Sequence, residues 1–391
     1  MSSIQIERAE RLKRLPPYLF AEIDRMKQEA QNDGWDIISL GIGDPDLPTP
    51  NHIIEELSVA SRRPANHQYP SYEGMLSFRT ACADWYEKRF GVGLDAASEV
   101  LSLIGSKEGI AHISLAFINP GDYALIPDPA YPVYEIGTYF ADGQVHFMPL
   151  TLEGDFLPDL GAIPTEVAKK TKLLYLNYPN NPTSACADVG FYNEVVEFAK
   201  SHDIIVCSDI AYSEMAFDDY KPVSFLNAEG AKDVGIEFHS LSKTYNMTGW
   251  RIAFAVGNAD VLAGLGSIKT NVDSGAFQAV QEAAIHALEA DQACVEDMCR
   301  TYQCRRDVIL EGLAKLGLKA NTPKATFYVW ISCPDGYTSS EFTGHLLKKC
   351  GIVTTPGNGF GPSGEGFVRM ALTVPEDRIR EALARIEKAG F

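Results

Sequence analysis

The chain of 391 residues has no uninterrupted apolar run near the ~18 residues that suggest a membrane-spanning helix. Its first residues, MSSIQIERAERLKRL, are charged where a secretory signal peptide needs an apolar segment. A basic surplus is also missing, because 34 Lys and Arg face 52 Asp and Glu and leave a formal net charge of -18. Such a charge repels phosphate backbones and anionic lipids. We therefore expect no nucleic-acid or membrane partner and a cytoplasmic location.

The eight cysteines include no CxxC pair, and no internal repeat or low-complexity tract occurs. Cys294, Cys299 and Cys304 are spaced by five residues, which on a helix turns each one about 140° from the last. Such side chains do not converge on a metal ion. We expect reduced packing cysteines and no metal site.

What the chain does contain indicates two domains, given its length and a hydrophobic fraction of 46%. From about residue 95 to 285, short apolar runs alternate with amphipathic helical patterns such as residues 191–202. This alternation predicts an α/β domain with a mostly parallel central sheet flanked by helices. The predicted strands are residues 100–104, 123–127, 173–177, 204–208, 237–240 and 251–256.

Beyond residue 285 the pattern changes to a long helix, two strands at residues 326–331 and 367–372, and a final helix for which Thr373, Pro375 and Glu376 predict a capping arrangement. This pattern predicts a smaller α+β domain. The first 45 residues are rich in proline, which predicts an extended arm. We expect an arm with part of the small domain at 1–45, a large domain at 46–285 and a small C-terminal domain at 286–391.

Polar residues follow the predicted strands, where ligands of open parallel sheets bind. Ser106 and Lys107, in GSKEG, open a helix whose N-terminus either binds phosphate or is simply capped. Tyr131, in DPAYPVY, either stacks on a flat heterocycle or packs in the core. Asn181, in YPNNPTS, is either an amide donor at the sheet edge or part of an ordinary turn.

The next two strand ends carry an acid and a lysine. Asp209, in SDIAY, follows a buried run and needs a cationic partner, such as a protonated pyridine nitrogen, with Tyr212 three residues on. Lys243, in SLSKTYN, either condenses with an aldehyde or extends its amine to solvent. The order of these groups along successive strand ends favours the chemical alternative.

This order resembles the class I/II aminotransferases of pyridoxal-phosphate (PLP) fold type I, with NNPT, SDIAY and SLSKTYNMTGWR in matching order along essentially the full chain. The resemblance implies PLP as cofactor and amino-acid and 2-oxo-acid substrates. It implies that Lys243 bonds to the cofactor aldehyde and shuttles a proton. Asp209 then pairs with the pyridine nitrogen, and Tyr212 and Asn181 hydrogen-bond to the ring oxygen.

The same resemblance assigns the remaining positions of the site. Tyr131 matches the residue that stacks on the ring, and the phosphate-binding positions are Ser106, Lys107, Ser240, Ser242 and Arg251. The substrate-binding positions are Arg369 for the α-carboxylate, Gly43, Tyr18 and Asn181. The resemblance also implies a homodimer with shared active sites, in which Tyr69 reaches the phosphate of the neighbouring subunit.

One residue departs from the family pattern, because Ser184 stands where the turn usually has glycine. Within the family, LPPYLFAEID, LGIGDPDLPTP and IGSKEGIAH resemble a bacterial branch that transfers an amino group between LL-2,6-diaminopimelate and 2-oxoglutarate in lysine biosynthesis. Glu73 is a hypothetical partner for the distal ammonium group. The alternatives are an aspartate, alanine or aromatic aminotransferase, a carbon-sulfur lyase, or a regulator of this fold without turnover.

Overall fold

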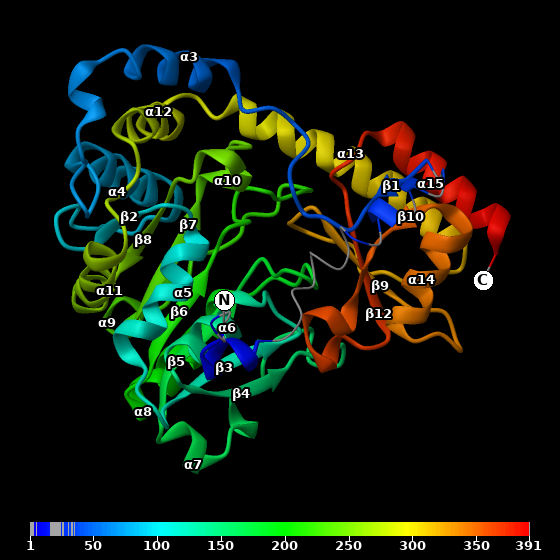
Figure 1. The fold of residues 1–391 in the computed structure, drawn as a ribbon, viewed down its shortest axis with the longest axis horizontal. Helices are drawn as coiled ribbons and strands as arrows, with labels where there is room; N and C mark the ends of the chain where they lie inside the picture. Colours follow the sequence, from blue (N-terminus) through cyan, green and yellow to red (C-terminus); the bar gives the residue numbers. More distant parts are fainter. Residues whose placement is uncertain are drawn as a thin grey trace.

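A computed structural model describes residues 4, 6–15, 25, 27–29, 31, 32, 34 and 36–390. Tyr18, predicted to bind substrate, lies outside the described residues. Two lobes are visible, and the long helix α13 (Ala293–Lys315) runs from beside α12 along the smaller lobe (Figure 1). Among the described residues, no helix has the length and apolar character needed to cross a membrane.

The large lobe contains a seven-stranded sheet in the order β2-β8-β7-β6-β5-β3-β4, which confirms the predicted mostly parallel α/β architecture (Figure 1). Only β8 runs against its two neighbours, so its first residues lie at the edge where the other strands end. The strands are β2 (Val100–Leu103), β3 (Tyr123–Asp128), β4 (Gln144–Pro149), β5 (Thr171–Asn177), β6 (Ile205–Asp209), β7 (Gly235–Ser240) and β8 (Ala253–Gly257).

Both faces of this sheet are buried, because successive side chains of a strand point to opposite faces. Leu173 and Tyr175 of β5 pack with helices α5, α6 and α11, whereas Leu174 and Leu176 pack in the main core on the other side. The helices around the sheet are α3 (Asn51–Ala60), α4 (Leu76–Phe90), α5 (Ser106–Phe117), α6 (Val133–Phe140), α7 (Thr165–Ala168), α8 (Val189–His202), α9 (Ala231–Val234), α10 (Leu241–Thr244), α11 (Ala259–Val272) and α12 (Gln278–Glu289).

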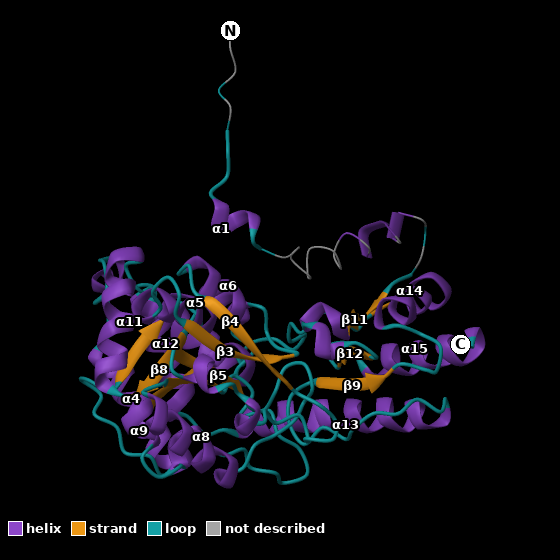
Figure 2. Cartoon of the chain, turned by 90° about the horizontal axis from the view of Figure 1, so that it is seen from below, coloured by secondary structure: helices purple, strands orange, loops and turns teal. Residues whose placement is uncertain are grey.

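The small lobe combines residues from both ends of the chain. Its antiparallel sheet has the order β11-β12-β9, and a separate parallel pair joins β1 to β10. Helices α13, α14 and α15 surround these strands (Figure 2). The bounds are β1 (Ile38–Ser39), β9 (Tyr328–Ser332), β10 (Ile352–Val353), β11 (Thr355–Pro356), β12 (Phe367–Ala371), α14 (Ser339–Cys350) and α15 (Glu376–Ala389). The domain boundaries 1–45, 46–285 and 286–391 stay a proposal.

The predicted capping of the final helix by Thr373 is wrong. Helix α15 begins at Glu376 after Pro375, and no side chain caps it. The hydroxyl of Thr373 instead donates to the carbonyl oxygen of Ile42 at 2.9 Å. This threonine therefore holds the segment after β1 against the end of β12.

The segment after β1 is fixed by hydrogen bonds to both lobes. Asp46 accepts from both terminal nitrogens of Arg305 in α13, at 2.7 and 2.9 Å. Thr49 donates to the carbonyl oxygen of Asn246, in the loop after α10, at 2.7 Å. Residues 41–49 therefore form a fixed strip between the lobes, and Gly43 lies on it.

Candidate active site

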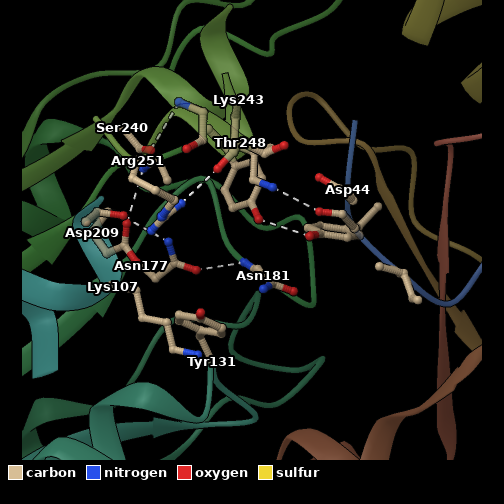
Figure 3. A pocket seen from close by; sticks show the side chains of 17 residues that line it. Asp44, Lys107, Tyr131, Asn177, Asn181, Asp209, Ser240, Lys243, Thr248 and Arg251 are labelled. Carbon is tan, nitrogen blue, oxygen red and sulfur yellow. Dashed lines mark hydrogen bonds between the residues drawn. The ribbon is translucent and has the colours of Figure 1, made fainter. Parts of the chain in front are cut away.

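A cavity of about 310 Å³ opens at the edge of the large sheet where its parallel strands end. Figure 3 shows the lining side chains, with Asp44 facing Asp209, Ser240 and Arg251 across the cavity. The structure brings eleven of the predicted site residues to this lining: Gly43, Ser106, Lys107, Tyr131, Asn181, Asp209, Tyr212, Ser240, Ser242, Lys243 and Arg251.

Lys243 reaches the cavity from α10, the short helix that directly follows β7. Its Nζ donates to the carbonyl oxygen of Gly43 at 2.9 Å. Desolvation lowers the pKa of this amine to about 8; the carboxylate of Asp44 opposes that shift, while the positive charges of Arg369 and Arg251 add to it. A substantial share of the amine is therefore neutral near pH 8 and able to accept a proton or attack a carbonyl carbon.

Asp209 ends β6 as a buried carboxylate. Its Oδ2 accepts from the hydroxyl of Tyr134 at 2.8 Å, and its Oδ1 accepts from the backbone N–H of Ala211 at 3.3 Å. Desolvation raises the pKa of this carboxyl group to about 6, and the two hydrogen bonds oppose that shift. None of the ion pairs formed between described residues includes Asp209. A cationic ligand nitrogen would meet its need for a partner.

Asn181 lies in the turn after β5, and hydrogen bonds that involve the ends of β5 and β6 hold it in place. The side chain of Asn177 donates to the carbonyl oxygen of Asp209 at 2.8 Å, and its Oδ1 accepts from the backbone N–H of Asn181 at 2.8 Å. The Oδ1 of Asn181 then accepts from Arg369 at 2.7 Å. This acceptor role points the two amide hydrogens of Asn181 away from the arginine, where they can serve a ligand oxygen.

Arg369, on β12, is fully buried behind the lining residues. Its two terminal nitrogens donate to Asn181 Oδ1 and to the carbonyl oxygen of Gly41, each at 2.7 Å. Its guanidinium carbon lies 4.2 Å from the ring centroid of Tyr328 and 4.6 Å from that of Phe360. Burial lowers the pKa of this group, and its Nε has no hydrogen-bond partner among the described residues. A buried guanidinium paired only with neutral oxygens is suited to an incoming carboxylate.

An anion-binding cradle lies at the opposite end of the cavity. Helix α5 begins at Ser106 after Gly105, whose φ of 97° favours glycine. A Cβ atom at Gly105 would lie 2.0 Å from a terminal nitrogen of Arg251, so glycine also makes room for that arginine. Arg251 precedes the reversed strand β8, which brings its charge to the start of α5. Helix start and guanidinium together favour a phosphate group.

Besides Arg369, which is buried behind the lining, two predicted residues do not line the cavity of their own chain. Tyr69 is 89% exposed and does not line the cavity. Glu73 is exposed, pairs at 3.5 Å with the buried Arg79, and is also absent from the lining. The hypothesis that Glu73 meets a distal ammonium group therefore gains no support within one chain.

Comparison with known proteins identifies the family. Residues 35–386 match the model of the aminotransferase class I and II family. This chain belongs to the class I and II aminotransferases. It is 60% identical over 384 residues, 98% of this chain and 99% of the relative, to the LL-diaminopimelate aminotransferase of Syntrophobacter fumaroxidans.

Solved structures agree with this assignment to the aminotransferases. Substrate-bound BacF from Bacillus subtilis is 40% identical, with a TM-score of 0.94 over 98% of each chain. Aspartate aminotransferase from Thermus thermophilus with maleate is 28% identical, with a TM-score of 0.91 over 99% of this chain and 100% of that one. The fold is therefore that of fold-type I aminotransferases.

The cofactor of this family is pyridoxal 5'-phosphate, and the cavity fits it. The buried Asp209 carboxylate suits a protonated ring nitrogen, and the start of α5 with Arg251 suits a phosphate. Lys243 supplies an amine with a lowered pKa in the lining of the same cavity. We propose the predicted cofactor contacts on this basis, with Tyr131 stacking on the ring.

Of the residues that the sequence interpretation overlooked in this aminotransferase site, four supply hydrogen bonds, charge or ring contacts. Asn177 ends β5 next to YPNNPTS, so the strand-end argument used for Asp209 could have found it. Tyr134 lies in the first turn of α6, three residues after Tyr131, and the two rings meet edge to face with their centroids 5.9 Å apart, a weaker indication. Asp44 and Tyr328 come from segments far apart in the sequence, and no local pattern marks them.

Proposed function

We propose that the protein is an LL-diaminopimelate aminotransferase. It transfers an amino group between LL-2,6-diaminopimelate and 2-oxoglutarate, forming glutamate and an amino-oxo acid that cyclises to tetrahydrodipicolinate in lysine biosynthesis. The observation that carries this proposal is the similarity to the relatives of that name from S. fumaroxidans and Aquifex aeolicus, 60% and 57% identical over 98% and 97% of this chain. The buried polar groups of the site support amino-group transfer as the reaction.

When bound, pyridoxal 5'-phosphate supplies an aldehyde that carries the amino group and a ring that accepts an electron pair. Lys243 would hold the group covalently through its Nζ, with the aldehyde oxygen leaving as water, and the same Nζ, when free, would move a proton to and from the substrate α-carbon. Its lowered pKa of about 8 suits both tasks near neutral pH. The carbonyl oxygen of Gly43 directs the Nζ toward the inter-lobe strip.

The other polar groups of the cavity bind and orient. Asp209 holds the ring nitrogen protonated, and Tyr134 fixes the orientation of that carboxylate. Tyr212 and Asn181 hydrogen-bond to the ring oxygen. Ser106, Lys107, Ser240, Ser242 and Arg251 hold the phosphate.

Arg369 binds the substrate α-carboxylate. It is buried, has an Nε without a protein partner, and is packed between two aromatic rings. The carboxylate gains charge-assisted hydrogen bonds in a site with little water, which strengthens them. Gly43 contributes backbone close to this position and leaves room for the phenol of Tyr328.

The decisive experiment is a panel of amino donors with 2-oxoglutarate as acceptor. LL-diaminopimelate should give the highest kcat/KM, measured as glutamate formation, above L-aspartate, L-alanine and aromatic amino acids. A Lys243→Ala variant should lose about 10³-fold or more in kcat, whereas Lys169→Ala, on the exposed surface, should keep it. A higher kcat/KM for another amino donor would contradict the proposed substrate. If no donor transfers its amino group to 2-oxoglutarate, the proposed reaction is wrong.

We propose a homodimer with shared active sites. The exposed aromatic and aliphatic side chains of Tyr69, Tyr72, Leu76, Val272 and Phe277 support a contact surface on the large lobe. In this arrangement Tyr69 reaches the phosphate bound by the partner subunit. The cytoplasmic location stays a prediction.

A further inference from the structure

Ser184 and Thr326 both hold backbone conformations that side chains disfavour. Ser184 has a φ of 62° in the turn after β5, and Thr326 has a φ of 71° just before β9. A positive φ is uncommon for serine and a clear outlier for a β-branched residue. Such conformations persist only when surrounding contacts enforce them, and they concentrate at functional sites.

The contacts that enforce them form a closed ring of hydrogen bonds around Tyr328. The backbone N–H of Tyr328 donates to Thr326 Oγ1 at 3.1 Å, and Ser184 Oγ donates to the carbonyl oxygen of Tyr328 at 2.7 Å. The two hydroxyl oxygens lie 2.9 Å apart. Because the Ser184 hydrogen is already used, Thr326 must donate to Ser184. Both backbone groups of Tyr328 are thus held by these hydroxyls, one from each lobe.

Tyr328 in turn contacts three parts of the site. Its hydroxyl lies 3.0 Å from that of Tyr212, and its ring lies under the guanidinium of Arg369 at 4.2 Å. A Cβ atom at Gly43 would lie 1.9 Å from the Tyr328 hydroxyl, so this phenol fits against bare backbone. A small shift of Tyr328 therefore changes the position of Arg369.

We propose that Ser184 and Thr326 are positioning residues for substrate binding: their hydroxyls fix Tyr328, and Tyr328 fixes the plane of Arg369. The inference rests on the proposed role of Arg369 in binding the substrate carboxylate. A serine that served only to complete hydrogen bonds in the turn would affect stability and leave substrate affinity unchanged. Affinity therefore separates the two roles.

The main variant is Ser184→Gly, which removes the hydroxyl while accepting the positive φ without strain. Its thermal unfolding midpoint should not fall, because relief of the left-handed backbone offsets the lost hydrogen bond. Its KM for both L-glutamate and LL-diaminopimelate should rise about fivefold, the size expected from one buried hydrogen bond, with kcat within about twofold. Calorimetric affinity for 2-oxoglutarate without an amino donor should fall by the same factor.

The matched control is Asp203→Gly, which relieves a similar backbone at φ 54° on the exposed end of α8, outside the cavity lining. It should leave KM unchanged. Thr326→Ala should raise KM by the same factor as Ser184→Gly, and Thr326→Ser, which keeps the hydroxyl, should have the wild-type KM. If Ser184→Gly does not fold, the KM values of the two Thr326 variants test the proposal in its place.

A KM and a calorimetric affinity that both stay within about twofold of wild type overturn the proposal. The two substrates separate this failure from that of the proposed function. If the wild type accepts L-glutamate and not LL-diaminopimelate, the proposed donor is wrong, and the glutamate measurements still test Ser184.

Discussion

The Nζ of Lys243 donates a hydrogen bond of 2.9 Å to the carbonyl oxygen of Gly43. The lysine follows a strand of the large lobe, and the glycine lies on the strip that β1 anchors to the small lobe. The two lobes therefore meet at the reactive amine. A shift of the strip changes the surroundings of the amine, and with them its pKa.

Asp44→Asn should lower the pKa of Lys243 below about 8, because the carboxylate of Asp44 favours the charged amine. In protein freed of cofactor, Lys243 should then acylate faster at pH 7, and the midpoint of its pH–reactivity curve should move down. Peptide mass spectrometry measures that curve. Asp203→Asn, on the exposed end of α8, is the control. An unchanged or higher midpoint rejects the role of Asp44.

Tyr134→Phe should raise the pKa of Asp209 above about 6, because the phenol donates to the ionised carboxylate and favours it. Since the site needs the carboxylate charged, kcat/KM should fall about tenfold at neutral pH and its acid limb should move to higher pH. Tyr175→Phe is the control: its ring stacks on Tyr134 at 5.1 Å, but its hydroxyl bonds to Ser114. Equal pH profiles for the two variants contradict this prediction.

Arg369→Lys should raise KM about 100-fold for both the amino acid and the oxo acid, with a smaller change in kcat. Lysine keeps the charge but cannot reproduce the planar fork that contacts Asn181, the Gly41 carbonyl oxygen and a carboxylate together. Steady-state kinetics with each substrate varied in turn measures the effect. Arg380→Lys, on the exposed surface, should match wild type. A normal KM removes Arg369 from substrate binding.

Mixing an impaired variant with an inactive one should raise activity if subunits share sites. Tyr69→Ala should lose about tenfold in activity through a weaker phosphate contact in the partner, and Lys243→Ala should lose nearly all. A mixed dimer of the two contains one site with both native residues, so activity should rise on subunit exchange. Lys243→Ala mixed with Asp209→Ala should not recover, because both residues serve their own chain. If activity does not rise when Tyr69→Ala is mixed with Lys243→Ala, Tyr69 does not contribute to the partner's site.

The large sheet was predictable because its central strands are buried on both faces and read as continuous apolar runs. The strand at residues 173–177, for example, is β5 (Thr171–Asn177), two residues longer at its start. The edge strand β4 was missed, since only Met148 of QVHFMP is buried and a histidine interrupts its apolar residues. The reversal of β8 has no local indication either, and it explains why Arg251 acts from the start of a strand.

The sequence predicts those site residues whose positions follow from the order of the strands along the chain. Asp209 and Lys243 follow buried strands directly, so their places at one sheet edge follow from the parallel topology. The contact between Asn181 and Arg369 joins residues 188 positions apart, which only tertiary packing determines. Tyr328 and its two hydroxyl partners depend on the same packing between lobes.

The pairing of β1 with β10 constrains the order in which the molecule can be assembled. Gly41 accepts a hydrogen bond from Thr355, 314 residues later, so the strip that carries Gly43 has no fixed place until the ribosome has made nearly the whole chain. At ordinary synthesis rates that interval is on the order of tens of seconds. The large sheet can form meanwhile, and the substrate pocket is completed only when the last strands emerge.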